Sequence, residues 1–337
     1  MSKINFAIIG CGRISKNHIE ALINNSDDCK LVALCDIVEN KAIERKKQYE
    51  NSIEGTSVKV YTDYIQMLKN EKIDVVSICT ESGYHANNAI DCLNHGKHVL
   101  IEKPMALSLE DADKIIELGK EKNLKVGVCH QNRFNPPIQK LRRAVEEGRF
   151  GKIINGTARI LWTRDQNYYD QAPWRGTKDL DGGTLMNQCI HNIDLLQWMM
   201  GSEVENVHCE RGTFLRNIEM EDFGAILIRF KNGSIGIVEG SACVYPKNLE
   251  ETLSIFGENG TVVIGGLAVN KIKTWQFADE RNYDKEDDST EVDSVYGKGH
   301  TPLYRDFVGA IRNNREPYIS GEEGKKALNI ILEAYKN

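Results

Sequence analysis

The first ~130 residues alternate short apolar runs with longer amphipathic segments. The apolar runs are continuous rather than alternating, which is typical of parallel strands buried on both faces. They lie at 4–9, 31–35, 75–79, 98–101 and 125–129. Helix-like segments separate them, near 14–25, 39–50, 85–95 and 108–121. Strands that alternate with helices predict a parallel sheet covered by helices.

The pattern changes after Pro136-Pro137. We expect a helix, an extended run and an apolar helix, in that order, at 138–147, 152–162 and 184–200. Between 204 and 276, five or six strand-like stretches follow, separated by turn signals such as Lys231-Asn232-Gly233. Strands in succession without helices between them predict a mostly antiparallel sheet.

The end of the chain predicts an acidic solvated loop at 279–293 and two helices, near 301–313 and 322–335. The fold class is therefore α/β. We predict a dinucleotide-binding domain over 1–130 and an α+β domain with an open, mostly antiparallel sheet over 131–337. The second domain would bind substrate and mediate oligomerisation, and its last helices could pack back on the first domain.

Composition limits the possible partners. The 337 residues carry 43 Lys and Arg against 49 Asp and Glu, a net charge of −6 that argues against nucleic acid or anionic membrane as a partner. No apolar run approaches the ~18 residues that span a bilayer, and the run at 6–9 is too short for a signal sequence. The nine cysteines show no paired close spacing. We therefore expect a cytoplasmic protein with neither a metal site nor a disulfide framework.

A glycine-rich turn follows the first strand. Its sequence, Gly10-Cys11-Gly12-Arg13-Ile14-Ser15, matches G-x-G-x-x-G except for Ser15. The first glycine permits a tight turn, and the second lets the backbone approach a pyrophosphate at the helix N-terminus. Asp36 ends the second strand near the ~20-residue spacing at which an acidic residue binds the ribose hydroxyls. This context disfavours the alternative, a turn that binds nothing, and predicts a Rossmann domain.

The charge of Asp36 also selects the cofactor. A carboxylate would repel a 2′-phosphate, and the next residues, Ile37 and Val38, supply no cation to offset it. The sequence therefore predicts NAD rather than NADP.

Two further features could carry chemistry. Glu102-Lys103-Pro104 follows the fifth strand, at the carboxyl edge where such sheets bind ligands, although most lysines after a strand lie simply on the surface. In the helix 184–200, a spacing of 3.6 residues puts four side chains on one face: Asn187, His191, Asp194 and Trp198. Such a face needs a ligand or a partner, and a hydrogen-bonded core histidine remains an equal alternative.

Together these motifs resemble the glucose-fructose oxidoreductase/inositol dehydrogenase/MocA family. The resemblance rests on G-C-G-R-I at 10–14, T-E-S-G-Y-H at 80–85, E-K-P at 102–104 and D-G-G-x-L followed by a histidine at 181–191. Further motifs resemble one branch, the UDP-N-acetyl-2-amino-2-deoxyglucuronate 3-dehydrogenases of surface polysaccharide synthesis. These are W-T-R-D-Q-N-Y-Y-D at 162–170, W-R-G-T at 174–177, L-M-N-Q at 185–188 and Y-P-K-N-L-E at 245–250.

The resemblance implies hydride transfer between NAD and the C3 hydroxyl of a UDP-sugar uronate. It makes Lys103 the lysine near the reacting hydroxyl and His191 the general acid/base. Asn187 stands where relatives commonly carry Asp, which puts a carboxylate relay there in doubt, and Glu81 replaces a frequent proline. The implied cofactor contacts are Gly10, Gly12, Arg13, Ile14, Asp36, Thr80, Ser82, His85, Glu102, Lys103, Gln131, Trp174 and Arg175.

Cations and aromatic residues of the second domain suggest how the substrate is held. Arg164, Arg175, Lys178 and Lys247 occur near Tyr168, Tyr169, Trp174 and Tyr245, a set that could bind a pyrophosphate, a uronate carboxylate and a uracil ring. Each residue taken singly is equally compatible with a solvated loop. The expected substrate contacts are Lys103, Arg164, Tyr168, Asn187, Gln188, His191, Tyr245 and Lys247.

Other functions remain as alternatives. The same residues would suit a dehydrogenase of another sugar nucleotide or of a free polyol such as inositol. A non-catalytic NAD-sensing protein would not need Lys103 together with His191.

The strand 223–230 predicts self-association. Phe223, Ala225 and Leu227 face one way, and Ile226, Ile228 and Phe230 face the other. Because a sheet that is apolar on both faces must cover both, we expect a homo-oligomer, a dimer or a homotetramer.

Overall fold

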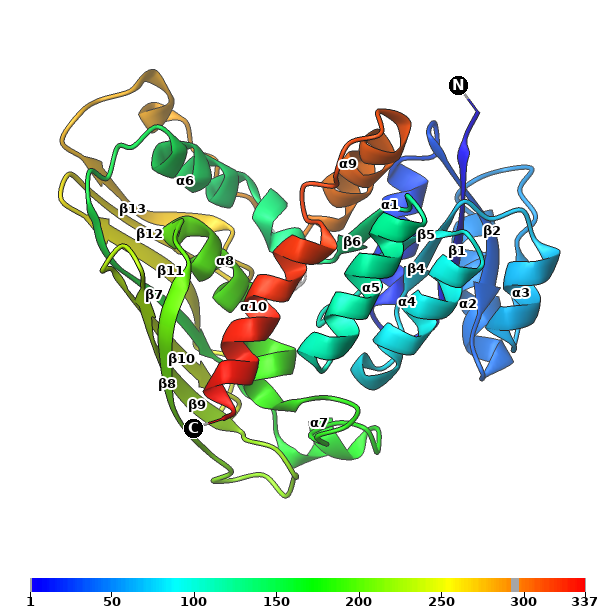
Figure 1. Cartoon of the computed structure of the whole chain (residues 1–337), viewed down its shortest axis with the longest axis horizontal. Coiled ribbons are helices and arrows are strands. Elements are labelled where there is room, and N and C mark those ends of the chain that lie inside the picture. Colours follow the sequence, from blue (N-terminus) through cyan, green and yellow to red (C-terminus); the bar gives the residue numbers. More distant parts are fainter. Residues whose placement is uncertain (1, 292–296, 337) are drawn as a thin grey trace. The chain divides into compact units, whose positions relative to one another are not determined.

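A computed structural model describes residues 2–291 and 297–336 (Figure 1). The chain divides into two compact units. The first contains Met1–His130 and His300–Lys325, and the second contains Gln131–Gly299 and Lys326–Asn337. Within the described ranges, no helix is long and apolar enough to cross a membrane.

The first unit contains a six-stranded, fully parallel sheet, as predicted, with the order β3-β2-β1-β4-β5-β6. Its strands are β1 (Ile4–Ile9), β2 (Cys29–Cys35), β3 (Lys59–Tyr61), β4 (Val75–Ile78), β5 (His98–Ile101) and β6 (Val126–Val128). The apolar pattern does not predict β3, because this edge strand is only three residues long and is partly exposed. In the register of the sheet, Ile9 at the end of β1 lies opposite Cys35 of β2 and Ile78 of β4. The loops that follow these three strands therefore leave the sheet at the same edge.

Helices cover this sheet. They are α1 (Ser15–Asn24), α2 (Glu39–Glu50), α3 (Tyr64–Asn70), α4 (His85–Asn94), α5 (Leu109–Glu121) and α9 (His300–Arg312). Side-chain caps start two of them: Asp63 accepts from the amides of Ile65 and Gln66, and Ser108 accepts from the Asp111 amide. In Figure 1, α4 lies beside α5, and α9, which comes from the far end of the sequence, packs on α1.

The second unit contains a seven-stranded sheet with the order β13-β12-β11-β7-β10-β9-β8. Only β7 and β10 pair in parallel, so the sheet is mostly antiparallel, as predicted. Its strands are β7 (Ile153–Leu161), β8 (Val204–Gly212), β9 (Phe223–Phe230), β10 (Ile235–Ser241), β11 (Glu250–Gly257), β12 (Gly260–Gly265) and β13 (Lys271–Phe277).

One face of this sheet is covered by a helical segment that begins with a π-helix. The π-helix (Leu185–Cys189) continues directly into α8 (Ile190–Met200). Glycines let it approach closely, since a Cβ on Gly240 would lie 2.5 Å from Cys189 Sγ and one on Gly224 would lie 2.7 Å from Leu185. The opposite face stays open, with Leu227 and Ile237 49% and 41% exposed.

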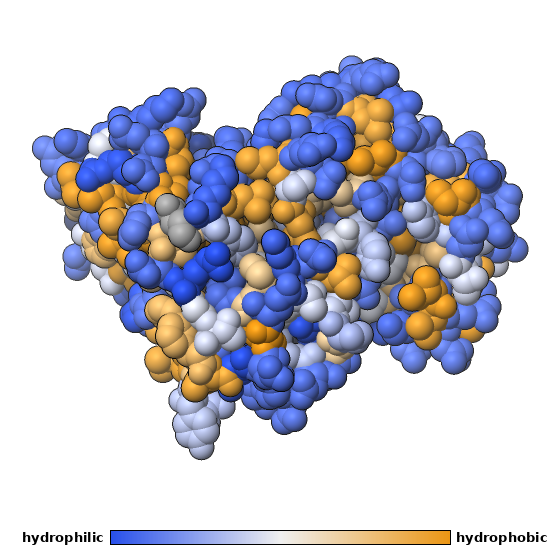
Figure 2. Space-filling view, turned by 60° about the horizontal axis from the view of Figure 1, so that its bottom comes forward, coloured by the Kyte–Doolittle hydropathy of each residue, from blue (hydrophilic) through white to orange (hydrophobic). Residues whose placement is uncertain are grey.

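The remaining helices are α6 (Pro136–Glu146), α7 (Gln166–Asp170) and α10 (Gly321–Ala334). The predicted acidic loop at 279–293 contains a short helical turn, Asn282–Lys285, and its positions 292 and 293 lie outside the described residues. Figure 2 shows apolar surface broken into separate patches among charged residues on the face it presents.

Candidate active site

The nucleotide-binding turn lies between β1 and α1. Gly10 has a φ of +87°, and a Cβ there would lie 2.6 Å from the backbone of Cys79 and Thr80, so only glycine fits. A Cβ on Gly12 would meet nothing within 4 Å, which leaves the open space that close approach of a ligand needs. Ser15 departs from the motif without disturbing it, because its Oγ donates a 2.7 Å hydrogen bond to the Gly12 carbonyl. Arg13 and Ile14 lie beside this turn, exposed and half-buried.

Asp36 contacts the same turn, as the spacing predicts. Its Oδ2 accepts from the Cys11 amide at 2.7 Å, and its Oδ1 accepts from the Val38 amide at 2.8 Å. A carboxylate oxygen can accept more than one hydrogen bond, so the fixed carboxylate retains capacity for ribose hydroxyls.

The loops after β4 and β5 are tied together by His85. Its Nδ1 lies 2.7 Å from the Pro104 carbonyl, and its Nε2 lies 3.0 Å from the Thr80 carbonyl. We expected His85 to contact the cofactor, but its ring is buried and both nitrogens are engaged within the unit. His85 therefore holds the loop that carries Lys103. Ser82 is also buried, and nothing in the structure explains Glu81.

Glu102 points into the interior, in contrast to its expected place among the cofactor contacts. Its Oε1 lies 2.9 Å from His18 Nε2 and 3.5 Å from His300 Nε2, and its Oε2 accepts from the Lys103 amide at 3.2 Å. Burial opposes the charge on Glu102, yet the hydrogen bonds from the two histidines hold its pKa well below the usual range. An ionised carboxylate therefore stands behind the backbone of the half-buried Lys103.

His18 continues this network inward. Its Nδ1 lies 2.7 Å from the Tyr304 hydroxyl, which in turn lies 2.6 Å from Ser77 Oγ. Burial lowers the pKa of His18, so the ring is neutral. A neutral ring that donates from Nε2 to Glu102 accepts at Nδ1 from Tyr304, and this one arrangement of protons satisfies every group.

In the second unit, four of the expected substrate residues form one hydrogen-bonded cluster. Arg164 Nε donates to Gln188 Oε1 at 3.1 Å, and Gln188 Nε2 donates to the Tyr168 hydroxyl at 3.2 Å and to Asn187 Oδ1 at 2.8 Å. Arg175 also belongs here: its guanidinium lies 4.1 Å from the centre of the Tyr168 ring, and that of Arg164 lies 5.2 Å from it. Trp174 packs under Arg175.

Two members of the cluster were missed from the sequence. Asp181 is buried and accepts from the Gly176 amide and from Asn187 Nδ2, so Asn187 does have a carboxylate partner, supplied from outside the helix. Asn248 accepts from the Thr163 amide at 2.9 Å and from Arg164 at 3.3 Å. The Asp-Gly-Gly turn was a signal for the first, but an isolated asparagine in a loop gives no signal for the second.

The structure does not bring Tyr245 and Lys247 into this cluster. Both side chains are exposed, Tyr245 at 92%. Within the same loop, it is Asn248 that contacts Arg164. Lys178 uses its amide to bond Glu219. Gln131 is buried in the second unit.

The predicted polar helix face divides in two. Asn187 and His191 are half-buried, whereas Asp194 is fully buried in a two-pronged ion pair with Arg133, at 2.6 and 2.7 Å. Trp198 stacks with Arg133 and Arg142. Of the two alternatives given for this face, a ligand or a partner, its inner half has a partner within the unit, because Arg133 pairs with Asp194. The π-helix at its start also departs from the 3.6-residue spacing.

Family models match both units. Residues 4–130 match the oxidoreductase family with an NAD-binding Rossmann fold, GFO_IDH_MocA, and residues 138–263 match the GFO/IDH/MocA C-terminal domain. The myo-inositol 2-dehydrogenase of Thermotoga maritima is 29% identical over 99% of this chain and 96% of its own length. The NAD(+)-dependent scyllo-inositol 2-dehydrogenase of Bacillus subtilis is 27% identical over 98% and 93%.

Two solved structures are more similar. The WlbA dehydrogenase from Bordetella pertussis, in complex with NADH and UDP-GlcNAcA, is 37% identical with a TM-score of 0.89, covering 100% of this chain and 95% of that one. WlbA from Chromobacterium violaceum, with the same two ligands, also gives 37% and 0.89, covering 99% and 93%.

Proposed function

Since the chain belongs to the GFO/IDH/MocA oxidoreductase family and is an NAD-dependent sugar dehydrogenase, we propose that its substrate is UDP-N-acetyl-2-amino-2-deoxyglucuronate, oxidised at C3. The observation that carries this proposal is the pair of guanidinium groups, from Arg164 and Arg175, that stack on Tyr168. A diphosphate and a uronate need such cations, whereas an uncharged polyol does not.

The proposed reaction uses two residues of this chain directly. A sugar hydroxyl is too weak an acid to ionise unaided, so His191 takes its proton as a neutral imidazole. Lys103 stabilises the developing negative charge on that oxygen. The turn at Gly10 and Gly12, with Asp36, would hold NAD, which supplies the hydride acceptor. The product is the 3-keto sugar, and we place the reaction in surface polysaccharide synthesis.

A second candidate is a free polyol, since two inositol dehydrogenases match nearly the whole chain. Reduction of NAD, followed with a UDP-sugar uronate, a UDP-sugar and free inositol, separates the possibilities. We expect turnover with the uronate alone. Faster turnover with inositol would contradict the proposal, and binding of NAD without turnover on any of the three would indicate an NAD sensor.

A substitution tests the cation pair directly. Arg175→Gln is expected to raise KM for the UDP-uronate by about tenfold or more, through a lost charge-assisted hydrogen bond. Lys152→Gln, which removes an exposed cation of the same unit, serves as the matched control. An unchanged KM for Arg175→Gln would contradict its role.

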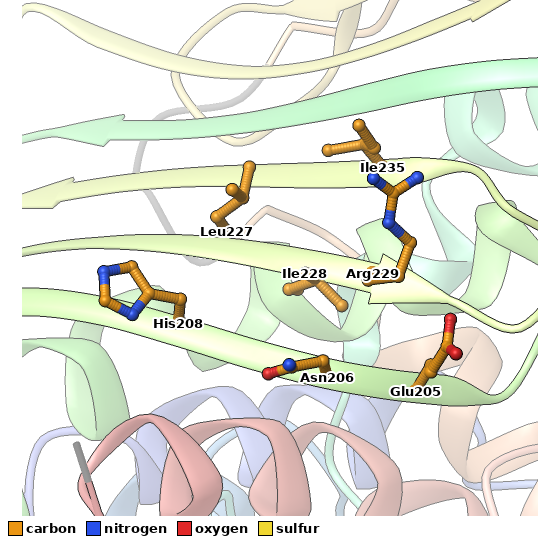
Figure 3. A pocket seen from close by; sticks show the side chains of 7 residues that line it. All are labelled: Glu205, Asn206, His208, Leu227, Ile228, Arg229 and Ile235. Carbon is orange, nitrogen blue, oxygen red and sulfur yellow. The ribbon is translucent and has the colours of Figure 1, made fainter.

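We also propose that the open sheet face pairs with a second copy, giving a dimer or tetramer. Figure 3 shows Leu227 and Ile235 on neighbouring strands, in a shallow pocket of about 430 Å³ shared with His208 and Arg229. Leu227→Asp should lower the mass in light scattering, while Leu215→Asp, in an exposed loop, should not. A wild-type mass near 38.1 kDa would contradict the proposal. The cytoplasmic location stays a prediction.

A further inference from the structure

A buried carboxyl group stands at the start of the helical segment that carries Asn187 and His191. Glu221 is 1% exposed, and its Oε1 lies 2.8 Å from the Leu185 amide and 2.8 Å from the Tyr335 hydroxyl. The backbone carbonyl of Glu221 accepts from the Thr184 amide at 3.2 Å. One residue therefore binds two successive amides where the helical segment begins.

The turn before this segment is shaped around the carboxyl group. Gly183 has a φ of +90°, and a Cβ there would lie 2.4 Å from Glu221 Oε2. Glycine at 183 therefore makes the room that the carboxyl group occupies. The function proposed above uses none of these atoms.

Counting protons fixes the state of this group. The Tyr335 hydroxyl has one hydrogen, yet it lies 2.6 Å from the Gly182 carbonyl as well as 2.8 Å from Glu221 Oε1. A carbonyl can only accept, so Tyr335 satisfies it only by donating there. The contact with Glu221 must then be donated by Glu221, which requires a carboxylic acid.

The ionised form fits this site poorly. Tyr335 would have to turn its hydrogen to the carboxylate, and the Gly182 carbonyl would lose its donor. Glu221 Oε2 makes no hydrogen bond within the part of the chain that the structure describes. A buried carboxylate here would therefore have hydrogen-bond donors at only one of its two oxygens, which is costly.

The surrounding charges favour the ionised form of Glu221 only weakly. Arg211 is the cation that faces the pair, with its guanidinium 4.8 Å from the centre of the Tyr335 ring. The thiols of Cys189 and Cys209 face the pair from the helical segment and from β8. Burial raises the pKa of Glu221 to about 7, against the Leu185 amide and Arg211, which both lower it.

We propose that Glu221 is a positioning residue, which as a neutral acid donates to Tyr335 and so fixes the turn from which Asn187 and His191 are presented. Loss of this proton as the pH rises through about 7 frees the turn and lowers kcat. The effect on kcat rests on the proposed roles of Asn187 and His191, but the proton itself can be observed without turnover.

Infrared difference spectra of the NAD-loaded protein locate the proton. We expect two carboxylic acid C=O bands, and the one that disappears as the pH rises through about 7 should be missing from Glu221→Gln and present in Glu251→Gln, whose own acid ionises at about pH 8. Glu210→Gln, which removes an exposed acid of the same unit, should leave the band in place. A spectrum in which Glu221→Gln removes no carboxylic acid band would overturn the proposal, whatever the substrate proves to be.

The pH profile of turnover gives the second readout. Because glutamine cannot ionise, Glu221→Gln should remove the decline of kcat near pH 7 while leaving KM for NAD unchanged. At low pH, kcat should fall no more than about tenfold, the value of one hydrogen bond. Tyr335→Phe, which keeps the carboxyl group and its burial but removes the acceptor of its proton, should move the decline to lower pH. A decline that persists unchanged in both variants would assign it to another group and overturn the proposal.

Discussion

Glu102 in the first unit and Glu221 in the second are both buried, yet their pKa values shift in opposite directions. Both oxygens of Glu102 are engaged, by two histidines and an amide, and its pKa is held well below the usual range. Glu221 has donors at one oxygen, and burial raises its pKa to about 7; Glu251 follows the same rule, with a pKa of about 8. Burial alone therefore does not set the charge of a carboxyl group here, because the charge also depends on how many hydrogen-bond donors reach its two oxygens.

The proposed roles of His191, in the second unit, and Lys103, in the first, can be separated by substitution. His191→Asn is expected to reduce turnover by about 10²–10⁴-fold, the usual contribution of a general base, with NAD affinity unchanged. Lys103→Met should reduce turnover as well and should weaken NAD binding. Steady-state kinetics and NAD titration measure both. Near-normal turnover in His191→Asn, with none in Lys103→Met, would make Lys103 the base.

Removing a hydrogen-bond donor to Glu102 tests the ionised member of this pair of carboxyl groups. His18→Leu leaves a buried carboxylate without its 2.9 Å hydrogen bond from the ring, and we expect the free energy of unfolding to fall by about 1.5–3 kcal/mol. Tyr304→Phe removes the outer hydrogen bonds to His18 and Ser77, between neutral groups, and should cost less, about 1 kcal/mol. Urea unfolding measures both values. Equal costs would mean that the hydrogen bond from His18 to the charged Glu102 contributes no more than one between neutral groups.

Asp36 is a charged carboxylate with capacity left for a ligand. Asp36→Asn keeps its size and removes its charge, so we expect NAD to bind about 10–100-fold more weakly and discrimination against NADP to shrink. Titration of both nucleotides into the apo protein provides the measurement. Comparable affinities of the wild type for NAD and NADP would contradict the ribose role.

The neutral carboxyl groups predict a pH dependence of stability. The unfolded chain releases the Glu251 proton near pH ~4.3, whereas the folded protein holds it to about pH 8. The unfolded state binds fewer protons in that interval, so this group makes the free energy of unfolding fall as the pH rises, by at most about 1.4 kcal/mol per pH unit. Urea midpoints across the interval should show a shallower decline for Glu251→Gln. The exposed-site control Glu258→Gln should match the wild type.

The sequence could predict both sheets and the nucleotide-binding turn, because apolar periodicity and glycine spacing are local signals. It could not predict the pairing of Asp194 with Arg133, 61 positions away, or the site of Glu221, since both depend on contacts between distant segments. The π-helix was also hidden, because one irregular turn leaves the apolar residues of a helix almost in place. The roles of Lys103 and His191 come from motif resemblance and stay predictions, whereas Glu102 and His85, assigned to the cofactor in the same way, make contacts inside the fold.

The return of the chain to its first unit has a consequence for protein synthesis. The Val128 amide on β6 bonds the Ile319 carbonyl, and His18 depends on Tyr304, so the nucleotide-binding unit is completed by residues made more than half a chain later. Domains usually fold in the order in which they leave the ribosome. Here the first 130 residues must wait without α9 and the Ile319 contact to β6, and a gene fragment that ends there would encode an unfinished domain.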